Sequence, residues 1–175
     1  MLTVRRADPA DIAAVVELVE SAYRGDASRV GWTTEADLLD GQRTDAGAVA
    51  EAIAGDSVVL LAMETDGGLL GCCQIDRQPG GNAYFGMFAV LPGSQGGGLG
   101  RELLAHAESF AREHFDATTM QMTVIGQREE LISWYERRGY RRTGESRPFP
   151  YGDGRFGMPR RDDLHFVVLE KSLTA

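Results

Sequence analysis

Hydrophobic residues follow two different spacings along the chain. Apolar positions three or four residues apart, as in Ile12, Val15 and Val19, predict amphipathic helices, and alternating ones, as in Met120 and Met122, predict strands. Helices are expected over residues 9–24, 34–39, 44–53, 99–115 and 129–138. Strands are expected over residues 2–6, 57–63, 69–76, 83–90, 118–125, 140–143 and 165–170. This order predicts an α/β (α+β) fold, with a mixed, mainly antiparallel sheet of about seven strands flanked by helices.

Local signals mark where several of these elements begin and end. Asp8 followed by Pro9 is typical of a helix start, because the carboxylate caps the first amides and proline already has a helical φ. Residues 65–68, Thr-Asp-Gly-Gly, predict a hairpin turn, and Gly139 is placed to end the helix 129–138. The chain has 175 residues and no internal repeat or linker, so residues 1–175 are expected to form a single domain.

One long segment shows no periodic pattern. Residues 144–163 contain three prolines and four glycines. Irregular segments of this length in compact domains are often functional lids or interface arms. The segment is therefore expected to form either a lid over a substrate or an arm of a homodimer.

Composition narrows the class of partner. The net charge of -8 argues against nucleic acid, because phosphate backbones bind basic surfaces. No apolar run approaches the roughly 20 residues that a membrane-spanning helix needs, which argues against a membrane partner. Cys72 and Cys73 are adjacent on a strand and point to opposite faces, so neither a disulfide nor a metal clip is expected. These features favour a cytoplasmic protein. His106, His114 and His165 lack metal-ligand spacing, and no metal is expected.

The most informative stretch is a glycine-rich turn between the strand 83–90 and the helix 99–115. It has glycine at four of the five positions 96–100. Backbone amides at the positive end of a helix bind phosphate groups. A nucleoside-triphosphate loop would need a lysine here, and the chain has only Lys171; a dinucleotide fingerprint would need glycine where Leu103 stands. The turn therefore predicts a pyrophosphate site of another kind.

Three motifs, in order, resemble the GNAT superfamily of acyl-CoA-dependent N-acetyltransferases. Residues 95–100, Gln-Gly-Gly-Gly-Leu-Gly, match the family signature Q/R-x-x-G-x-G/A. Residues 88–92, Phe-Ala-Val-Leu-Pro, are similar to the strand that leads into this turn, and residues 133–140 are similar to its LYEKLGF element. The resemblance spans nearly the whole chain and is strongest over residues 84–140. It implies acetyl-CoA as co-substrate and an amine, on a small molecule or a peptide, as acceptor.

The resemblance also implies roles for particular residues. Backbone groups of Phe88, Ala89 and Val90 would hold the pantetheine arm, and the Val90 amide would stabilise the oxyanion. The turn that would hold the CoA pyrophosphate comprises Gln95, Gly96, Gly97, Gly98, Leu99, Gly100 and Arg101. Tyr135 aligns with the family's general acid, and a phenol with an ordinary pKa of about 10 is protonated at neutral pH. The implied reaction is direct attack of the amine in a ternary complex, with neither a metal nor a covalent enzyme intermediate.

Two positions depart from the family pattern. An asparagine that often contacts the cofactor, seven residues before the tyrosine, is replaced by Arg128, so that contact is changed or lost. A glutamate base found in some relatives is replaced by Thr123, which cannot serve as one. The remaining candidates for the base are Glu64, Asp76, Glu129 and His165. A water chain, or an amine that arrives neutral, is the alternative.

The sequence does not choose the acceptor. In the family the acceptor enters beside segments that correspond to residues 23–40 and 144–163. Candidate aromatic walls there are Tyr23, Trp32, Phe149, Tyr151 and Phe156. Asp26, Glu35 and Asp37 would attract a cation, whereas Arg147, Arg155, Arg160 and Arg161 would bind a carboxylate or phosphate. Two other functions stay open at this point: an acyl-CoA-binding sensor without catalysis, and a transferase for another acyl-CoA or an O-acceptor.

Overall fold

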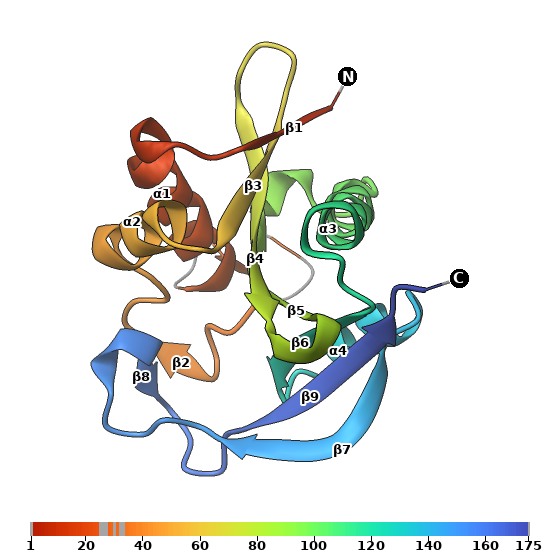
Figure 1. The fold of residues 1–175 in the computed structure, drawn as a ribbon. Helices are drawn as coiled ribbons and strands as arrows, with labels where there is room; N and C mark the ends of the chain where they lie inside the picture. The colour runs from red at the N-terminus through yellow and green to blue at the C-terminus, as the bar shows by residue number, and fades with distance from the viewer. Residues whose placement is uncertain (1, 25–27, 30, 32–33, 175) are drawn as a thin grey trace.

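The computed structural model describes residues 2–24, 28–29, 31 and 34–174. Figure 1 shows its elements arranged around one central, twisted sheet. The α-helices are α1 Ile12–Tyr23, α2 Ala46–Ala54, α3 Leu99–Phe115 and α4 Glu129–Glu136. The strands are β1 Thr3–Arg6, β2 Leu39–Asp40, β3 Val58–Met63, β4 Leu69–Gln78, β5 Asn82–Val90, β6 Thr119–Ile125, β7 Arg141–Pro148, β8 Met158–Pro159 and β9 His165–Ser172.

Seven strands form a single mixed sheet in the order β1-β3-β4-β5-β6-β9-β7, and β2 pairs separately with β8. The neighbours β5 and β6 are parallel, and the other paired strands of the sheet are antiparallel. The predicted fold class, a mainly antiparallel sheet of about seven strands flanked by helices, is confirmed.

Helices cover both faces of the sheet (Figure 1). On one face, α1 and α2 bury residues such as Val19 and Val49 against β3, β4 and β5. On the other, α3 and α4 bury residues such as Leu103 and Ile132. The alternation of side chains along β4 places Cys72 in the first cluster and Cys73 in the second, as predicted. Both thiols are free and buried.

The start of the first helical segment also follows the sequence. The Asp8 carboxylate accepts a hydrogen bond from the Ala10 amide at 2.8 Å, and the Asp11 carboxylate accepts one from the Asp8 amide at 2.8 Å. This reciprocal arrangement is a capping box, with Pro9 at the first helical position. Residues Pro9–Asp11 form a 3-10 turn that leads into α1, which ends one residue before Arg24.

Two segments differ from the sequence prediction. The helix expected over residues 34–39 is a single turn, in which the amides of Leu38 and Leu39 donate to the Glu35 carbonyl. It gives way to β2 because Leu39 and Asp40 pair with β8. The strand expected over residues 140–143 runs from Arg141 to Pro148 as β7. Every residue of β7 is exposed, so its sequence carries no apolar alternation that would have revealed its length.

The segment 144–163 is therefore only partly irregular. Its first five residues belong to β7, and its later residues return to pair with β2. Phe149 and Leu164 are buried in a small cluster with Leu39 and Ile125. The later part of the segment thus packs against residues 38–40 and against the end of β6.

The parallel strands β5 and β6 separate after a short paired stretch. Their register covers only Asn82–Tyr84 of β5. Further along β5, its pairing with β4 shifts by one residue, and Met87 in the shifted region has a positive φ of 46°. Such a bulge bends a strand and increases its twist. The separation of β5 from β6 opens the middle of the sheet, and this is where the candidate site lies.

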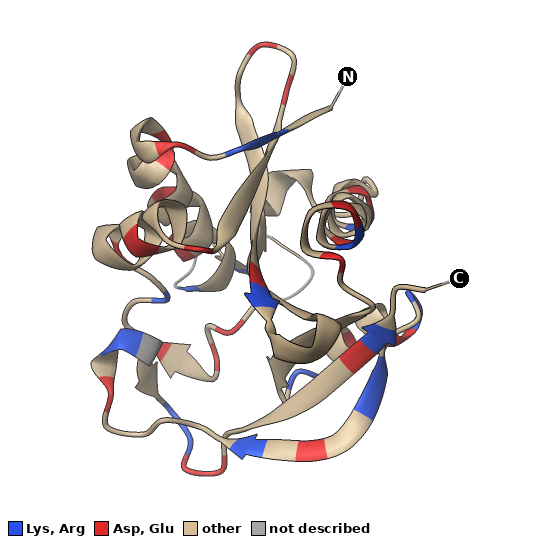
Figure 2. Ribbon diagram, viewed as in Figure 1, with Lys and Arg blue, Asp and Glu red and all other residues tan. Residues whose placement is uncertain are grey.

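Basic and acidic residues alternate along β7, which Figure 2 shows as blue and red segments of this edge strand. Arg142 forms an ion pair with Glu129 at 2.8 Å, and Arg147 forms one with Glu145 at 3.0 Å. Charged side chains on an edge strand discourage pairing with another chain. Within the residues that the structure describes, no helix combines the length and apolar character needed to cross a membrane.

Candidate active site

The glycine-rich turn has a backbone that only glycine adopts readily. Gly96 has φ 91° and Gly98 has φ 86°, both in the left-handed region that favours glycine. Gly98 is also the N-cap of α3, and its carbonyl accepts the first helical hydrogen bond, from the Glu102 amide at 3.0 Å. At Gly100, a Cβ atom would lie 3.3 Å from the Phe88 ring. The turn thus brings bare backbone to the positive end of a helix of 17 residues.

A cavity of about 420 Å³ lies over this turn. We call it the turn cavity, and its lining residues are Ala22, Tyr23, Phe88, Ala89, Val90, Gln95, Gly96, Gly97, Gly98, Gly100, Arg101, Arg128, Leu131, Trp134 and Arg138. All the residues that the sequence assigned to the cofactor line it, except Leu99. The side chain of Leu99 instead packs against the core under α3.

The turn cavity is electropositive. Its charged lining residues are Arg101, Arg128 and Arg138, and no acidic residue lines it in the part of the chain that the structure describes. Arg138 lies 3.5 Å above the Trp134 ring and donates to the Trp134 carbonyl at 2.7 Å. Partial burial lowers the pKa of Arg138, and the neighbouring cations Arg137 and Arg101 lower it further. Such a cavity favours an anion, because a bound phosphate would relieve the repulsion between these guanidinium groups.

The sequence had assigned no role to Trp134 or Arg138, although both lie in a recognised motif. A signal for them was present: Leu131, Trp134 and Arg138 recur at three- and four-residue spacing, which places them along one face of α4 and its final turn. Their shared face is the one that borders the turn cavity.

The last residues of β5 present backbone groups to the gap beside β6. The Leu91 amide donates to the Leu70 carbonyl at 2.8 Å, so Gly71 and Val90 form the next pair, which exchanges no hydrogen bonds. The N–H and C=O of Val90 therefore point away from β4. The Val90 carbonyl accepts a hydrogen bond from Gln95 Nε2 at 3.0 Å, which ties the turn to the strand. The Phe88 carbonyl accepts one from the Tyr23 hydroxyl.

A second cavity, of about 460 Å³, lies between the separated strands β5 and β6. We call it the sheet cleft. It is lined by β4, β5 and β6, by the ends of α1 and α2, and by Phe149 and Arg155 from the returning segment. Tyr23, Phe88, Arg128 and Leu131 line both cavities. The turn cavity and the sheet cleft therefore meet at the middle of the molecule, beside the bulge in β5.

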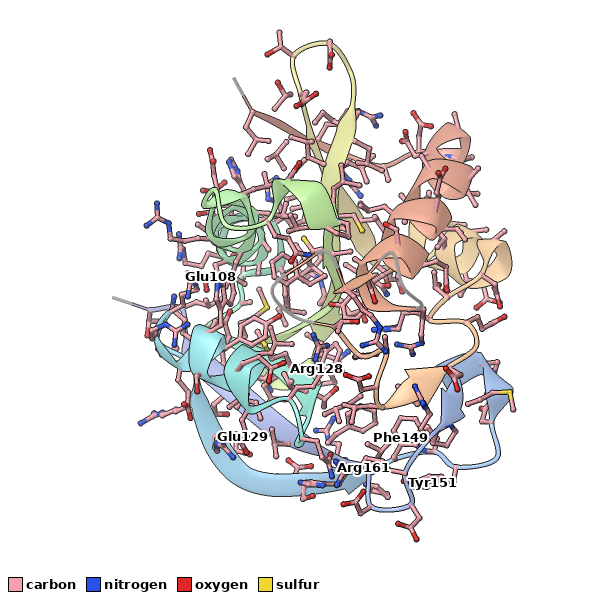
Figure 3. All side chains as sticks on the ribbon, turned by 180° about the vertical axis from the view of Figure 1, so that it is seen from behind. Glu108, Arg128, Glu129, Phe149, Tyr151 and Arg161 are labelled. Atoms are coloured by element: carbon pink, nitrogen blue, oxygen red, sulfur yellow. The ribbon has the colours of Figure 1, made fainter. Side chains whose placement is uncertain are left out.

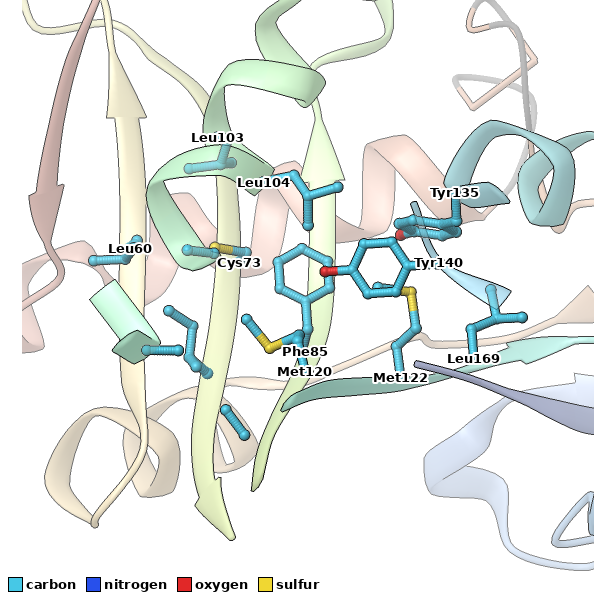
Figure 4. Close-up of a cluster of buried hydrophobic side chains, with 14 of the residues drawn as sticks. Leu60, Cys73, Phe85, Leu103, Leu104, Met120, Met122, Tyr135, Tyr140 and Leu169 are labelled. Carbon is cyan, nitrogen blue, oxygen red and sulfur yellow. The ribbon is translucent and has the colours of Figure 1, made fainter. Parts of the chain in front are cut away.

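Tyr135 lines the sheet cleft and belongs to the hydrophobic core as well (Figure 4). Its ring lies 5.8 Å from that of Tyr140 and 6.4 Å from that of Phe88, measured between centroids. The residue is only 4% exposed. Burial raises the pKa of Tyr135 well above its usual value, so the phenol is protonated across the neutral range. The predicted general acid thus reaches the cleft from a packed position.

Arg128, at the position of the family's asparagine, is labelled in Figure 3 and takes part in a buried charge cluster. Its guanidinium donates to Glu35 at 2.9 Å, and Arg24 pairs with the other oxygen of Glu35. Arg128 also lies 5.5 Å from the centre of the Tyr23 ring. Burial would raise the pKa of Glu35, but the positive charges of Arg128 and Arg24 outweigh this and lower it. No local pattern indicated this cluster, because its members come from three distant segments.

The other predicted acceptor residues divide between the cleft and the outer surface. Tyr23, Phe149 and Arg155 line the sheet cleft, whereas Tyr151, Arg147, Arg160 and Arg161 do not. Glu35 is already engaged by two arginines, and Asp37 pairs with Arg29 at 2.8 Å on the surface, so the prediction that they attract a cation is not supported. Asp26, Trp32 and the side chain of Phe156 lie outside the part of the chain that the structure describes.

Of the four candidates for a general base, only Asp76 lines the sheet cleft. Glu129 forms a surface ion pair with Arg142, and Glu64 and His165 line neither cavity. Asp76 lies opposite Tyr84 across β4 and β5, whereas Val90 lies opposite Gly71. Five residues of strand therefore separate Asp76 from the level of Val90, roughly 16 Å at 3.3 Å per residue. Thr123, at the position of the missing glutamate, shares a hydrogen bond of 2.5 Å with Tyr84.

Comparison with known proteins places these features in a family. The model of the acetyltransferase (GNAT) family matches residues 13–140. No curated protein sequence matches the chain. Among solved structures, the ribosomal-protein-S18-alanine N-acetyltransferase from Escherichia coli has a TM-score of 0.72 at 15% identity, over 100% of this chain and 96% of that one. The spermidine/spermine N-acetyltransferase SpeG from Vibrio cholerae has a TM-score of 0.68 at 14% identity, over 99% and 95%.

A further solved structure connects the fold to a cofactor. The yncA protein from Salmonella typhimurium, solved with acetyl-CoA, has a TM-score of 0.67 at 23% identity, over 100% of this chain and 95% of that one. At these identities the structures show the shared fold alone. The family model covers well over half of the chain, and it describes acyltransferases that use acetyl-CoA. The chain therefore belongs to the GNAT acetyltransferase family.

Proposed function

We propose that this protein transfers an acetyl group from acetyl-CoA to an amine by direct attack in a ternary complex. The observation that carries the proposal is the junction of two cavities at Tyr23, Phe88, Arg128 and Leu131. One cavity is suited to a phosphate-bearing ligand, and the other is open to a second molecule. Two substrates that enter from opposite sides would meet beside the end of β5, without a covalent enzyme intermediate.

In this proposal the turn cavity holds CoA. Amides of residues 96–101 bind the pyrophosphate at the N-terminus of α3, and Arg101 and Arg138 supply positive charge. The stretch Phe88, Ala89 and Val90 lies along the pantetheine arm on the side of β5 that β6 leaves open, and the arm pairs there with backbone groups on either side of Ala89, which itself pairs with Cys72 of β4. The Val90 amide points to that side and stabilises the oxyanion that forms when the amine attacks.

Tyr135 acts in this proposal as the general acid. The amine nitrogen forms a bond to the thioester carbon, the carbon–sulfur bond breaks, and the departing thiolate takes the phenolic proton. The raised pKa of Tyr135 keeps that proton available at neutral pH. Asp76 is too far along β4 to reach an amine beside Val90 directly. The proton that the amine loses therefore leaves through water in the sheet cleft, or the amine binds in its neutral form.

Binding of acetyl-CoA is the first test. A ligand that binds only the folded state at about 100 times its Kd stabilises that state by about 2.7 kcal/mol. For a chain of this size we expect the melting temperature to rise by several degrees. Release of free thiol on addition of amines then tests transfer. No stabilisation by millimolar acetyl-CoA would remove the support for the turn cavity as a CoA site.

A pair of glycine substitutions tests the turn itself. Gly97 lines the turn cavity and Gly93 does not, yet neither has a positive φ. A Cβ at Gly93 meets nothing within 4 Å, and one at Gly97 meets only the Ser94 carbonyl at 4.0 Å. Both backbones therefore accept leucine, and we expect similar melting temperatures without ligand. Gly97→Leu should weaken acetyl-CoA binding at least tenfold by calorimetry, and Gly93→Leu should not. Equal affinities in the two variants would contradict the assignment.

A further inference from the structure

The charged residues of the sheet cleft are not all equally available to a ligand. The acidic ones are Glu35, Asp45 and Asp76, and the basic ones are Arg24, Arg43, Arg128 and Arg155. A substrate is recognised by charges that the protein has not already compensated. The partners of each group therefore decide which kind of acceptor the cleft favours.

Each of the three acidic side chains already accepts hydrogen bonds from other residues of the protein. Glu35 lies between two arginines. Asp45 caps α2 by accepting from the Ala48 amide at 2.8 Å, and it also accepts from Gln42 Nε2 at 3.1 Å. Asp76 accepts from Gln74 Nε2 at 3.0 Å and lies toward the end of the cleft remote from Val90. The carboxylates of the cleft are thus poorly placed to receive a cationic group near the junction with the turn cavity.

Arg43 is differently placed. Its guanidinium carbon lies 5.3 Å from the centre of the Tyr23 ring. Among the residues that the structure describes, this guanidinium group makes no hydrogen bond and no ion pair, although its charge helps to lower the pKa of Glu35. Its backbone is held firmly, because the amides of Arg43 and Thr44 donate to Glu20 Oε1 at 2.6 and 2.7 Å. A guanidinium on a fixed backbone, exposed to a cleft, is suited to bind an oxyanion through paired charge-assisted hydrogen bonds.

Arg43 is also close to the place where the two cavities meet. It stacks on Tyr23, and the hydroxyl of that tyrosine bonds the Phe88 carbonyl beside the bulge in β5. Arg128 lies 5.5 Å from the same ring. Among the described residues around Tyr23, the guanidinium groups of Arg24, Arg43 and Arg128 outnumber the carboxylates of Glu20 and Glu35. The guanidinium of Arg43 therefore adds positive charge to the wall of the sheet cleft.

We propose that the acceptor is a small amine that also carries a carboxylate, as an amino acid does, and that Arg43 binds this carboxylate on the wall of the sheet cleft. The proposal rests on the proposed function, since it places the amine at the junction with the turn cavity. It makes Arg43 a specificity-determining residue. A polyamine lacks the anionic group and brings a second positive charge toward the arginines, so it is a poor acceptor.

The test compares matched acceptors and matched variants. Each amino acid in a panel is assayed beside its carboxamide, which has the same shape and no negative charge, and beside spermidine. Arg43→Gln and Arg43→Lys are compared with the wild type and with Arg112→Gln, an exposed arginine that bonds only Ser109 in α3. We expect carboxylates to be preferred at least tenfold in kcat/KM. Arg43→Gln should raise the acceptor KM about tenfold or more and erase that preference, while the KM for acetyl-CoA stays unchanged. Arg43→Lys should restore part of the preference.

The outcomes separate this inference from the proposed function. Turnover that prefers carboxamides or spermidine, or that is indifferent to Arg43→Gln, overturns the inference and leaves acetyl transfer standing. If acetyl-CoA stabilises the protein but no amine releases thiol, the proposed acetyl transfer is wrong. The inference about Arg43 is then tested by the binding of the acceptor panel alone. Calorimetry of amino acids and their carboxamides, with the CoA-saturated wild type and Arg43→Gln, then supports the inference if only the wild type discriminates, and overturns it otherwise.

Discussion

Tyr135→Phe should lower kcat by about 10²-fold or more and leave the affinity for acetyl-CoA within about twofold. Loss of a general acid removes a factor of about 10²–10⁴ from the rate. Phenylalanine keeps the ring that packs against Tyr140 and Phe88, so the core is preserved and only the hydroxyl is lost. Steady-state kinetics with saturating amine, together with calorimetry of acetyl-CoA, gives both quantities.

Tyr140→Phe is the matched control for this experiment. Tyr140 is also a buried tyrosine, and its hydroxyl donates to Glu108 at 2.9 Å on the side of the core where Lys171 pairs with the same carboxylate. Its loss should reduce stability by about 1.5–3 kcal/mol, the usual net contribution of a hydrogen bond to a charged group, and leave kcat unchanged. A core role for Tyr135 alone predicts that both substitutions behave alike.

The structure also contains a second tyrosine that is a candidate for the proton donor. Tyr23 lines both cavities, and burial raises its pKa too. Its hydroxyl is engaged by the Phe88 carbonyl, so we assign it a positioning role at the end of β5. Tyr23→Phe should therefore change KM more than kcat. If Tyr23→Phe abolishes turnover and Tyr135→Phe does not, the proton donor is Tyr23.

The parts of the fold that the sequence predicted well are those specified by local chemistry. The periodic segments became α1, α3 and the central strands, and the cap at Asp8 formed as expected. The glycine-rich turn was also predictable, because the positive φ angles at Gly96 and Gly98 favour glycine at those positions. These features depend on neighbours within a few positions, and such information is present in the sequence itself.

The features that the sequence missed depend on distant partners. β2 replaced an expected helix because it pairs with β8, more than a hundred residues later. β7 was underestimated because its exposed residues lack apolar alternation. Arg43 lies in no motif, and the role in recognition that we propose for it depends on the placement of Tyr23 beside β5. The acceptor side of the site was therefore the part least accessible to sequence reasoning.

Glu35→Gln should destabilise the protein by about 3–5 kcal/mol. Glu35 is the buried carboxylate shared by Arg24 and Arg128, and all three side chains are less than 10% exposed. Removing one partner of a buried ionic group leaves uncompensated charge in a region of low dielectric constant, which costs about that much. Glutamine has nearly the same shape, so the measured loss reports charge and hydrogen bonding rather than a cavity. Chemical denaturation of both proteins at pH 7 measures the difference.

The pH dependence provides an independent check on the same group. Because the folded protein lowers the pKa of Glu35, its ionisation stabilises the fold above the unfolded pKa of about 4.3 and stops doing so as the pH falls through the lower folded value. The wild type should therefore lose part of its stability below about pH 4.3, and Glu35→Gln should lack that part of the loss. Glu129→Gln is the control, because Glu129 pairs with Arg142 on the surface, where such a pair contributes about 0–1 kcal/mol. If Glu35→Gln and Glu129→Gln both lower the free energy of unfolding at pH 7 by the same small amount, Glu35 is not a buried, charged residue.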